Sequence, residues 1–156
     1  MKLERIINTK IKTKHILTLI NNYKQIKQVV DFTGIQNGLI HPTDIDAVLE
    51  FDNDVLIIIE LKYKNAEIPT GQRLVIERIC NSWHTKKSVV LKVEHDFNVE
   101  NEAIPLDSCR VTKIYYNSKW HKKNINLVDQ LNNLGKHFNC NKLQFNTNNE
   151  QRTSLF

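Results

Sequence analysis

Two short segments separated by a turn signal, residues 46–51 and 55–62, constrain the fold more than any other feature of the sequence. The second segment is rich in β-branched residues, which is typical of a buried strand. The first alternates apolar and polar positions well enough for a strand, and residues 52–54 between them are Asp-Asn-Asp, which favours a turn. The pattern therefore predicts a β-hairpin whose second strand is buried.

Hydrophobic periodicity predicts the elements around this hairpin. Apolar residues recur at helical spacing in residues 14–30, 72–83 and 126–138, and Thr70 is the expected N-cap of the middle helix. Residues 88–94 and 111–116 are predicted to be further strands. The expected order is α-β-β-α-β-β-α, an α/β fold with a mixed central β-sheet flanked by helices.

The length of 156 residues suits one domain with a hydrophobic core. We expect this domain to cover residues 1–138. From residue 139 onward the chain is rich in Asn and lacks periodicity. This composition predicts a flexible C-terminal tail over residues 139–156.

Several features favour a cytoplasmic protein with no membrane partner. The longest apolar run, residues 55–59, is far shorter than the roughly 20 residues that span a bilayer, and the N-terminus lacks an apolar signal segment. The three cysteines, Cys80, Cys109 and Cys140, have no paired spacing of the kind found in zinc or redox motifs. We expect free thiols in a reducing compartment.

The net charge of +5 is unevenly distributed along the chain. Residues 2–27 contain seven basic residues and one acidic residue, and residues 110–123 contain five basic residues and no acidic one. A basic rim around a more acidic middle suits an enzyme that holds a polyanion and binds cations at its centre. The alternative is a lysine-rich protein with two solvated faces.

Three charged side chains are expected to meet at the hairpin. Residues i and i+2 of a strand share a face, so Glu60 and Lys62 project together, and the neighbouring strand can bring Asp46 beside them. Two carboxylates this close repel each other unless a divalent cation lies between them, and oxygen ligands suit Mg²⁺ or Mn²⁺. Lys62 can then orient a water molecule or stabilise the charge on a phosphate. The alternative is an ordinary ion pair at the surface.

These residues resemble the motif of the PD-(D/E)xK nuclease superfamily, which includes restriction enzymes, junction resolvases and repair nucleases. The resemblance implies a restriction-endonuclease-like core that hydrolyses phosphodiester bonds of DNA. The residues that carry it are Pro42-Thr43-Asp44-Ile45-Asp46, then Ile57-Ile58-Ile59-Glu60-Leu61-Lys62, with thirteen residues between Asp46 and Glu60, and finally Gln72 at the start of the predicted helix.

The resemblance also implies a role for each residue. Asp46 and Glu60 would be the metal-binding carboxylates, with the backbone carbonyl of Leu61 as a further ligand. Lys62 would be the catalytic lysine. Gln72 resembles the helix glutamine of several branches, including small virus-type and replication-repair nucleases, and joins the catalytic group.

Two departures from the family pattern leave details open. The proline does not directly precede the aspartate, so Asp44 competes with Asp46 for the first position; Asp46 is preferred because it leads directly into the alternating strand. Residues 14–30 contain no acid, although some branches place another carboxylate there, unless Glu4 serves. The number of metal ions therefore stays open.

The implied function is a Mg²⁺-dependent endonuclease or exonuclease in replication, recombination, repair or defence, in a bacterium or a phage-infected cell. Branched or single-stranded DNA is an expected partner. The alternative is a catalytically silent nucleic-acid-binding or phage inhibitor protein with the same fold. Intact Asp46, Glu60 and Lys62 favour the enzyme.

Further residues are candidates for contacts with nucleic acid. His41 can reach DNA or the scissile phosphate, although a loop histidine is more often a solvated turn residue. Trp120 can stack on an exposed base or cap the core beside the strand at residues 111–116, and both interpretations stay open. The remaining candidates are basic: Lys64, Lys119, Lys122 and Lys123.

The C-terminal residues 151–156 resemble the short peptides that dock on the bacterial sliding clamp. Ser154, Leu155 and Phe156 match that pattern, but the glutamine stands one position too early. Packing of these residues on their own domain is the alternative. A homodimer is compatible with the sequence, which does not determine the oligomeric state.

Overall fold

The structure is a computed structural model that describes residues 35, 42–98 and 103–145. The chain divides into two units, Met1–Pro42 and Thr43–Phe156, and all elements described below belong to the second unit. The helix predicted at residues 14–30 lies outside the described residues. One domain over residues 1–138 therefore stays a prediction.

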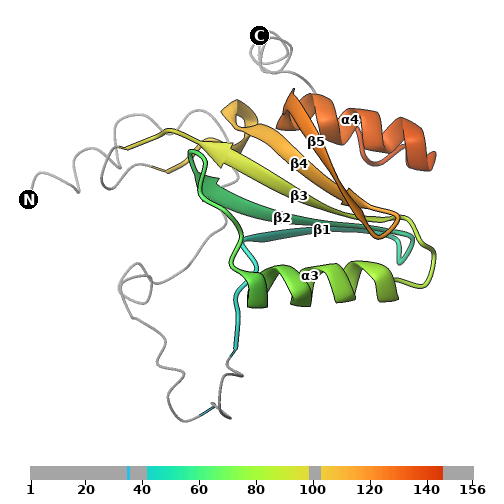
Figure 1. Cartoon of the computed structure of the whole chain (residues 1–156). Helices are drawn as coiled ribbons and strands as arrows, with labels where there is room; N and C mark the ends of the chain where they lie inside the picture. The colour runs from blue at the N-terminus through green and yellow to red at the C-terminus, as the bar shows by residue number, and fades with distance from the viewer. Residues whose placement is uncertain (1–34, 36–41, 99–102, 146–156) are drawn as a thin grey trace, which may run out of the picture. The chain divides into compact units, whose positions relative to one another are not determined.

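Five strands form one mixed sheet in the order β1-β2-β3-β4-β5 (Figure 1). Strands β2 and β3 are parallel, and the other neighbouring pairs are antiparallel. The hairpin and the α/β class with a mixed sheet are confirmed. The strand bounds are β1 Ala47–Phe51, β2 Val55–Tyr63, β3 Ser88–His95, β4 Arg110–Tyr116 and β5 Lys119–Asn126.

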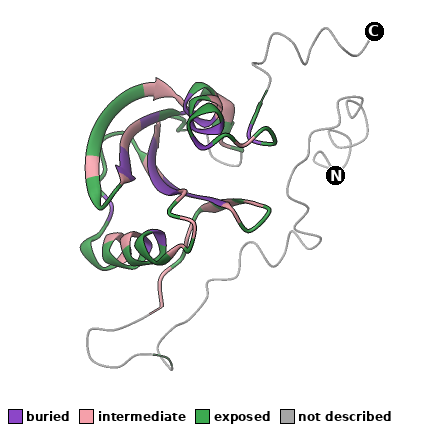
Figure 2. Cartoon of the chain, turned by 90° about the vertical axis from the view of Figure 1, so that its right-hand side faces the viewer, coloured by how far each residue is buried: buried purple, intermediate pink, exposed green. Residues whose placement is uncertain are grey.

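Two helices pack on opposite faces of this sheet (Figures 1 and 2). Helix α3, Thr70–Ser82, connects the parallel strands β2 and β3, and helix α4, Leu127–Phe138, follows β5. A short 3-10 helix, η2, spans Leu106–Ser108 before β4. Neither α3 nor α4 is long and apolar enough to cross a membrane.

Alternation along the strands separates two hydrophobic cores. In β2, Ile57 and Ile59 pack in the core that includes α4, whereas Leu56 and Ile58 pack in the core that includes α3. Residues 55–60 are all buried, and the buried colour in Figure 2 follows the central strands. Of the three free cysteines, Cys80 and Cys109 are buried and Cys140 is partly exposed.

The element order differs from the predicted one. Within the described residues it is β-β-α-β-β-β-α, because β5 was not predicted from the sequence. This edge strand carries mostly exposed polar residues, so its strand conformation depends on pairing with β4 rather than on hydrophobic alternation. Thr70 was wrongly predicted as the N-cap of α3; the N-cap is Pro69, without a side-chain capping hydrogen bond.

The chain remains packed on the domain beyond the end of α4. Asn139 adopts a left-handed conformation that ends the helix, and the backbone N–H of Cys140 donates to the Gly135 carbonyl at 2.8 Å. Leu143 is completely buried. Residues 139–145 therefore belong to the fold rather than to the predicted tail, because Leu143 fills part of the core beside α4. Residues 146–156, including Ser154, Leu155 and Phe156, lie outside the described residues.

Two glycines offer a test of this packing. A Cβ at Gly135 would lie 2.1 Å from the Leu143 carbonyl oxygen, whereas a Cβ at Gly71 would meet nothing within 4 Å. We expect Gly135→Ala to lower the free energy of unfolding by about 1–3 kcal/mol through this clash. Gly71→Ala should change it by at most about 1 kcal/mol, and toward stability, because alanine favours helices. Urea unfolding of both variants measures this. Equal stabilities would show that residues 140–145 do not pack against α4.

Candidate active site

The candidate site lies where β2 continues beyond the end of β1. Pairing between the two strands stops at Ala47, which is opposite Ile59. Asp46 directly precedes β1, and its Oδ2 atom accepts a hydrogen bond from the backbone N–H of Leu61 at 2.7 Å. The aspartate side chain therefore covers the open edge of β2 beside Glu60 and Lys62.

Hydrogen bonds join β2 to the first turn of α3. The Nζ atom of Lys62 lies 3.2 Å from Glu60 Oε2 and 3.3 Å from Gln72 Oε1. The side-chain amide of Gln72 donates to the backbone carbonyl of Asp44 at 3.1 Å. Glu60, Lys62, Gln72 and the segment before β1 thus form one connected network.

Glu60 is the most unusual group in this network. It is completely buried, and its Oε1 atom has no hydrogen-bond partner among the described residues. Burial raises the pKa of Glu60, and the nearby charges of Asp46 and Asp44 raise it further, while the hydrogen bond from Lys62 opposes this rise. A buried carboxylate with an unused acceptor atom is suited to a cation that would supply the missing partner.

The oxygen atoms near Glu60 suit a hard divalent cation. Within a strand, the N–H and carbonyl of one residue point to the same edge, so the Leu61 carbonyl lies on the edge that faces Asp46. Two carboxylates and one carbonyl suit Mg²⁺ or Mn²⁺, because Mg²⁺ commonly takes one or two carboxylates and keeps several waters. No cluster of three or more His, Cys, Asp or Glu side chains suited to a metal occurs in the described residues.

The predicted site residues come together in the structure. Asp46, Glu60, Lys62 and Gln72 are linked through the contacts above, although they come from different parts of the chain. Asp44 is exposed, and its described contact is the carbonyl that holds Gln72. It therefore positions Gln72 through its backbone while its charge acts on Glu60.

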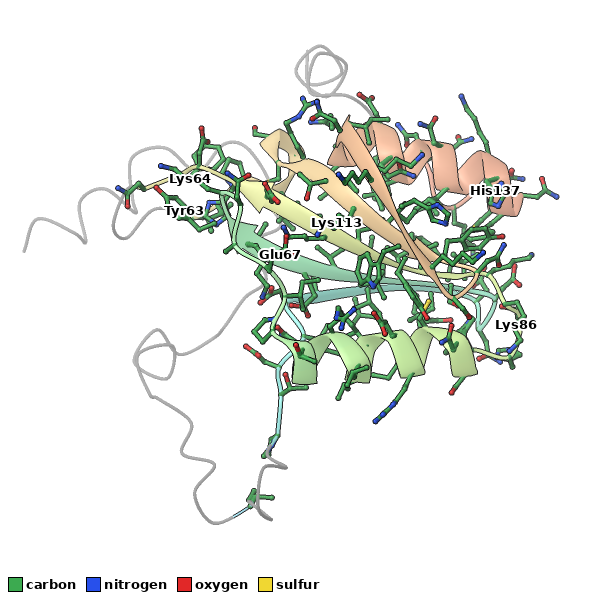
Figure 3. The ribbon with its side chains drawn as sticks, viewed as in Figure 1. Tyr63, Lys64, Glu67, Lys86, Lys113 and His137 are labelled. Atoms are coloured by element: carbon green, nitrogen blue, oxygen red, sulfur yellow. The ribbon has the colours of Figure 1, made fainter. Side chains whose placement is uncertain are left out.

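The predicted nucleic-acid contacts are more dispersed. His41 lies outside the described residues. Lys64 follows β2, and its Nζ atom lies 5.0 Å from the centroid of the Tyr63 ring, a pair that projects beyond the sheet in Figure 3. Lys119 begins β5 and is exposed. Lys123 lines a cavity between the sheet and α4.

Trp120 has a structural role in this fold. Its ring packs against Tyr115 with 5.3 Å between centroids, and its indole N–H donates to Glu77 of α3. It joins the core beneath α3. Of the two interpretations left open by the sequence, these contacts favour the capping of the core.

Sequence reasoning missed Lys92 and Lys113. Across the sheet, Glu60 is opposite Lys92, and Lys92 is opposite Lys113. Lys113 is in turn opposite Lys122 on β5. A row of three lysines therefore runs from the candidate site across the face that carries α3. The signal for Lys92 in the sequence was a lysine with apolar residues on both sides of it in the strand.

The three lysines line a cavity of about 440 Å³. Thr70 and Arg73, from the first turn of α3, form part of its wall. Lys92 is only 2% exposed, which is rare for a lysine and requires nearby carboxylates. The candidate carboxylate site and a basic cavity thus share one face of the sheet.

Comparisons with protein-family models, with curated proteins and with solved structures found no match. The functional argument therefore depends on the geometry of the site and on the motif that it contains. Both concern the same residues, since Asp46, Glu60, Lys62 and Gln72 carry the motif and form the network.

The burial of Glu60 predicts a conflict between stability and metal binding. Glu60→Gln removes the buried charge and keeps the shape of the side chain. We expect it to raise the free energy of unfolding of the metal-free protein at neutral pH by on the order of 1 kcal/mol. Mg²⁺ should raise the melting temperature of the wild type but not of the variant. Thermal unfolding with EDTA and with Mg²⁺ measures both effects.

The pH dependence provides the control for this variant. Because the pKa of Glu60 is raised in the folded protein, the folded state binds more protons than the unfolded chain between the two pKa values. Stability from this group therefore increases as the pH falls through the raised pKa. The advantage of Glu60→Gln should shrink in mild acid. An advantage that stayed constant with pH would mean that the buried charge is not its cause.

Proposed function

We propose that the protein is a metal-dependent nuclease that hydrolyses phosphodiester bonds of DNA. The observation that carries this proposal is the buried Glu60 carboxylate, whose Oε1 atom lacks a partner among the described residues and which lies beside Asp46 and Lys62. The resemblance to the PD-(D/E)xK superfamily concerns these same residues. A hairpin, a crossover helix and a parallel strand around them support a restriction-endonuclease-like core.

Asp46, Glu60 and the Leu61 carbonyl would hold the metal ion. When bound, Mg²⁺ acts as a Lewis acid toward a phosphate oxygen and lowers the pKa of a bound water molecule. Asp46 is exposed and can meet a ligand from solvent, whereas Glu60 presents its carboxylate from inside the sheet.

Lys62 would act on the reacting phosphate or water. Its side chain is 17% exposed, so it is partly accessible from solvent while hydrogen bonds to Glu60 and Gln72 hold its Nζ atom in place. A lysine held in this way can orient the attacking water and stabilise negative charge that develops on the phosphate. Gln72 is a positioning residue for Lys62, and the Asp44 carbonyl in turn positions Gln72.

The burial of Glu60 favours the enzyme over a catalytically silent binding protein. A buried carboxylate with an unused acceptor lowers the stability of the metal-free fold. A protein that only occupied DNA or an enzyme surface could use exposed basic residues and would gain nothing from this arrangement. Such unfavourable groups are concentrated at sites where chemistry requires them.

Variants of the site residues test the proposed activity. We expect Asp46→Ala, Glu60→Ala and Lys62→Ala each to reduce cleavage of plasmid DNA with Mg²⁺ or Mn²⁺ by roughly 10²-fold or more. Gln72→Ala should have a smaller effect, because it acts through Lys62. EDTA should abolish cleavage by the wild type. Circular dichroism establishes that each variant is folded.

Matched controls separate site effects from general charge effects. Lys136→Ala removes an exposed lysine of α4, and Glu50→Ala removes an exposed carboxylate of β1. Both should cleave at the wild-type rate, and Asp44→Ala should lose less activity than Asp46→Ala. Full activity of Asp46→Ala together with an inactive Asp44→Ala would transfer the first carboxylate to Asp44.

Calcium should separate binding from cleavage. We expect Ca²⁺ to support DNA binding without efficient cleavage, because it occupies oxygen sites with looser geometry than Mg²⁺. Binding should also weaken steeply with salt, since lysine contacts to phosphate release counterions. Fluorescence anisotropy with linear duplex, single-stranded, flap and four-way-junction DNA measures both. Affinity that does not change between low and physiological salt would contradict a polyanionic substrate.

A further inference from the structure

The basic cavity beside the candidate site already holds one carboxylate. Glu67 lies in the segment between β2 and α3, and its two oxygens accept hydrogen bonds from Lys113 Nζ at 2.9 and 3.0 Å. One of these oxygens is also 3.6 Å from Lys92 Nζ. Figure 3 shows Glu67 and Lys113 projecting toward one another in front of the sheet. An anion held by two lysines thus occupies the cavity wall.

The contacts of Glu67 make it easy to displace. Its side chain is 67% exposed, and it belongs to a connecting segment rather than to a strand or helix. Ion pairs of such exposed groups contribute little net stability. If Glu67 moved away, Lys92 would keep a carboxylate partner, because Glu94 Oε1 lies 2.7 Å from its Nζ atom. Glu94 is itself held by the hydroxyl of Thr112 at 2.9 Å.

The excess of basic residues in the cavity favours an anion that offers more acceptor oxygens than the single carboxylate of Glu67. Arg73, Lys92, Lys113 and Lys122 line it, and Glu67 is the one acidic residue among its described lining residues. Lys122 forms no ion pair with the described residues. Phosphate offers several acceptor oxygens to lysines that are arranged around it.

The position of the cavity distinguishes its ligand from the scissile phosphate. Lys113 lies two strands away from Glu60, which is on the order of 10 Å at roughly 4.8 Å per strand. The Nζ atom of Lys113 is hydrogen-bonded to Glu67, so it is directed into the cavity and not toward a phosphate beside Asp46 and Glu60. A neighbouring phosphate of the same strand of nucleic acid could reach it.

We propose that this cavity binds a phosphate group of the substrate strand next to the scissile one, and that Glu67 occupies this position until the strand displaces it. The proposal rests on the proposed nuclease function and adds a subsite to it. Glu67 then acts as an internal competitor of the substrate. Its removal strengthens binding, whereas removal of Lys113 or Lys122 weakens it.

Binding of a short single-stranded oligonucleotide to the full chain in EDTA tests the proposal without cleavage. Glu67→Gln should tighten binding about three- to tenfold, because two lysines lose a competing carboxylate. Glu50→Gln makes the same change in net charge on β1, whose residues do not line this cavity, and should have no more than a small effect. Equal effects of the two variants would reduce the role of Glu67 to net charge and overturn the proposal.

Lysine variants locate the effect within the cavity. Lys113→Ala and Lys122→Ala should each weaken binding about three- to tenfold. Lys136→Ala is the matched control, because it removes an exposed lysine of α4 that does not line this cavity. In the Lys113→Ala background, Glu67→Gln should tighten binding less than it does in the wild type. Independent, additive effects would contradict a shared phosphate position.

Inorganic phosphate distinguishes a strand phosphate from a free anion. At millimolar concentration it should compete weakly with the oligonucleotide in the wild type, and more strongly in Glu67→Gln. Strong binding of phosphate together with unchanged oligonucleotide binding in Lys113→Ala would assign the cavity to a free anion and overturn the proposal.

The same variants separate this subsite from the nuclease function. Binding effects as expected, in a protein that cleaves no DNA with any divalent metal, would contradict the proposed activity and leave a nucleic-acid-binding cavity. Cleavage with an unchanged KM in both Glu67→Gln and Lys113→Ala would contradict the subsite and leave the activity.

Discussion

Strand β2 has no exposed face along most of its length, and the arrangement of the domain depends on this burial. Ile57 and Ile59 require the α4 side of the sheet to be covered, and Leu56 and Ile58 require α3 on the other side. A strand buried on both faces belongs inside a sheet, so β1 and β3 pair with its two edges. Glu60, which is still completely buried, and Lys62 then follow these apolar residues at the point where β1 no longer covers the edge of β2.

Four charged residues on β2 and β3 alternate in sign, so that each of the four lies beside an opposite charge. In β2 the acid precedes the base by two residues, and in β3 the order is reversed, with Lys92 before Glu94. The parallel register places Glu60 opposite Lys92 and Lys62 opposite Glu94. Opposite charges on neighbouring strands stabilise a sheet, and the nearly buried Lys92 also forms an ion pair with Glu94 of its own strand at 2.7 Å. Oε1 of Glu60 is the acceptor that this pattern leaves without a partner in the described part of the chain.

The candidate site could be predicted because its key residues follow local rules. The parity of a strand places Glu60 and Lys62 together, and the short turn after residue 51 brings Asp46 back toward them. The lysine row could not be predicted in this way. Lys113 and Lys122 join Glu60 only through the registers of three successive strand pairs, two of which contain a register shift. Strand β5 was also missed, because its exposed polar residues give no periodic signal.

The sequence by itself determined the hairpin, the helix that follows it and the identity of the network around Glu60. Each depends on interactions between near neighbours in the chain, which hydrophobic periodicity and turn residues report directly. Only the tertiary structure decided that Trp120 packs in a core, that Leu143 extends the domain and that Glu67 lies between Lys92 and Lys113. These outcomes depend on the register between strands that are distant in sequence and on which parts of the sheet the helices cover. The type of a side chain alone specifies neither of these.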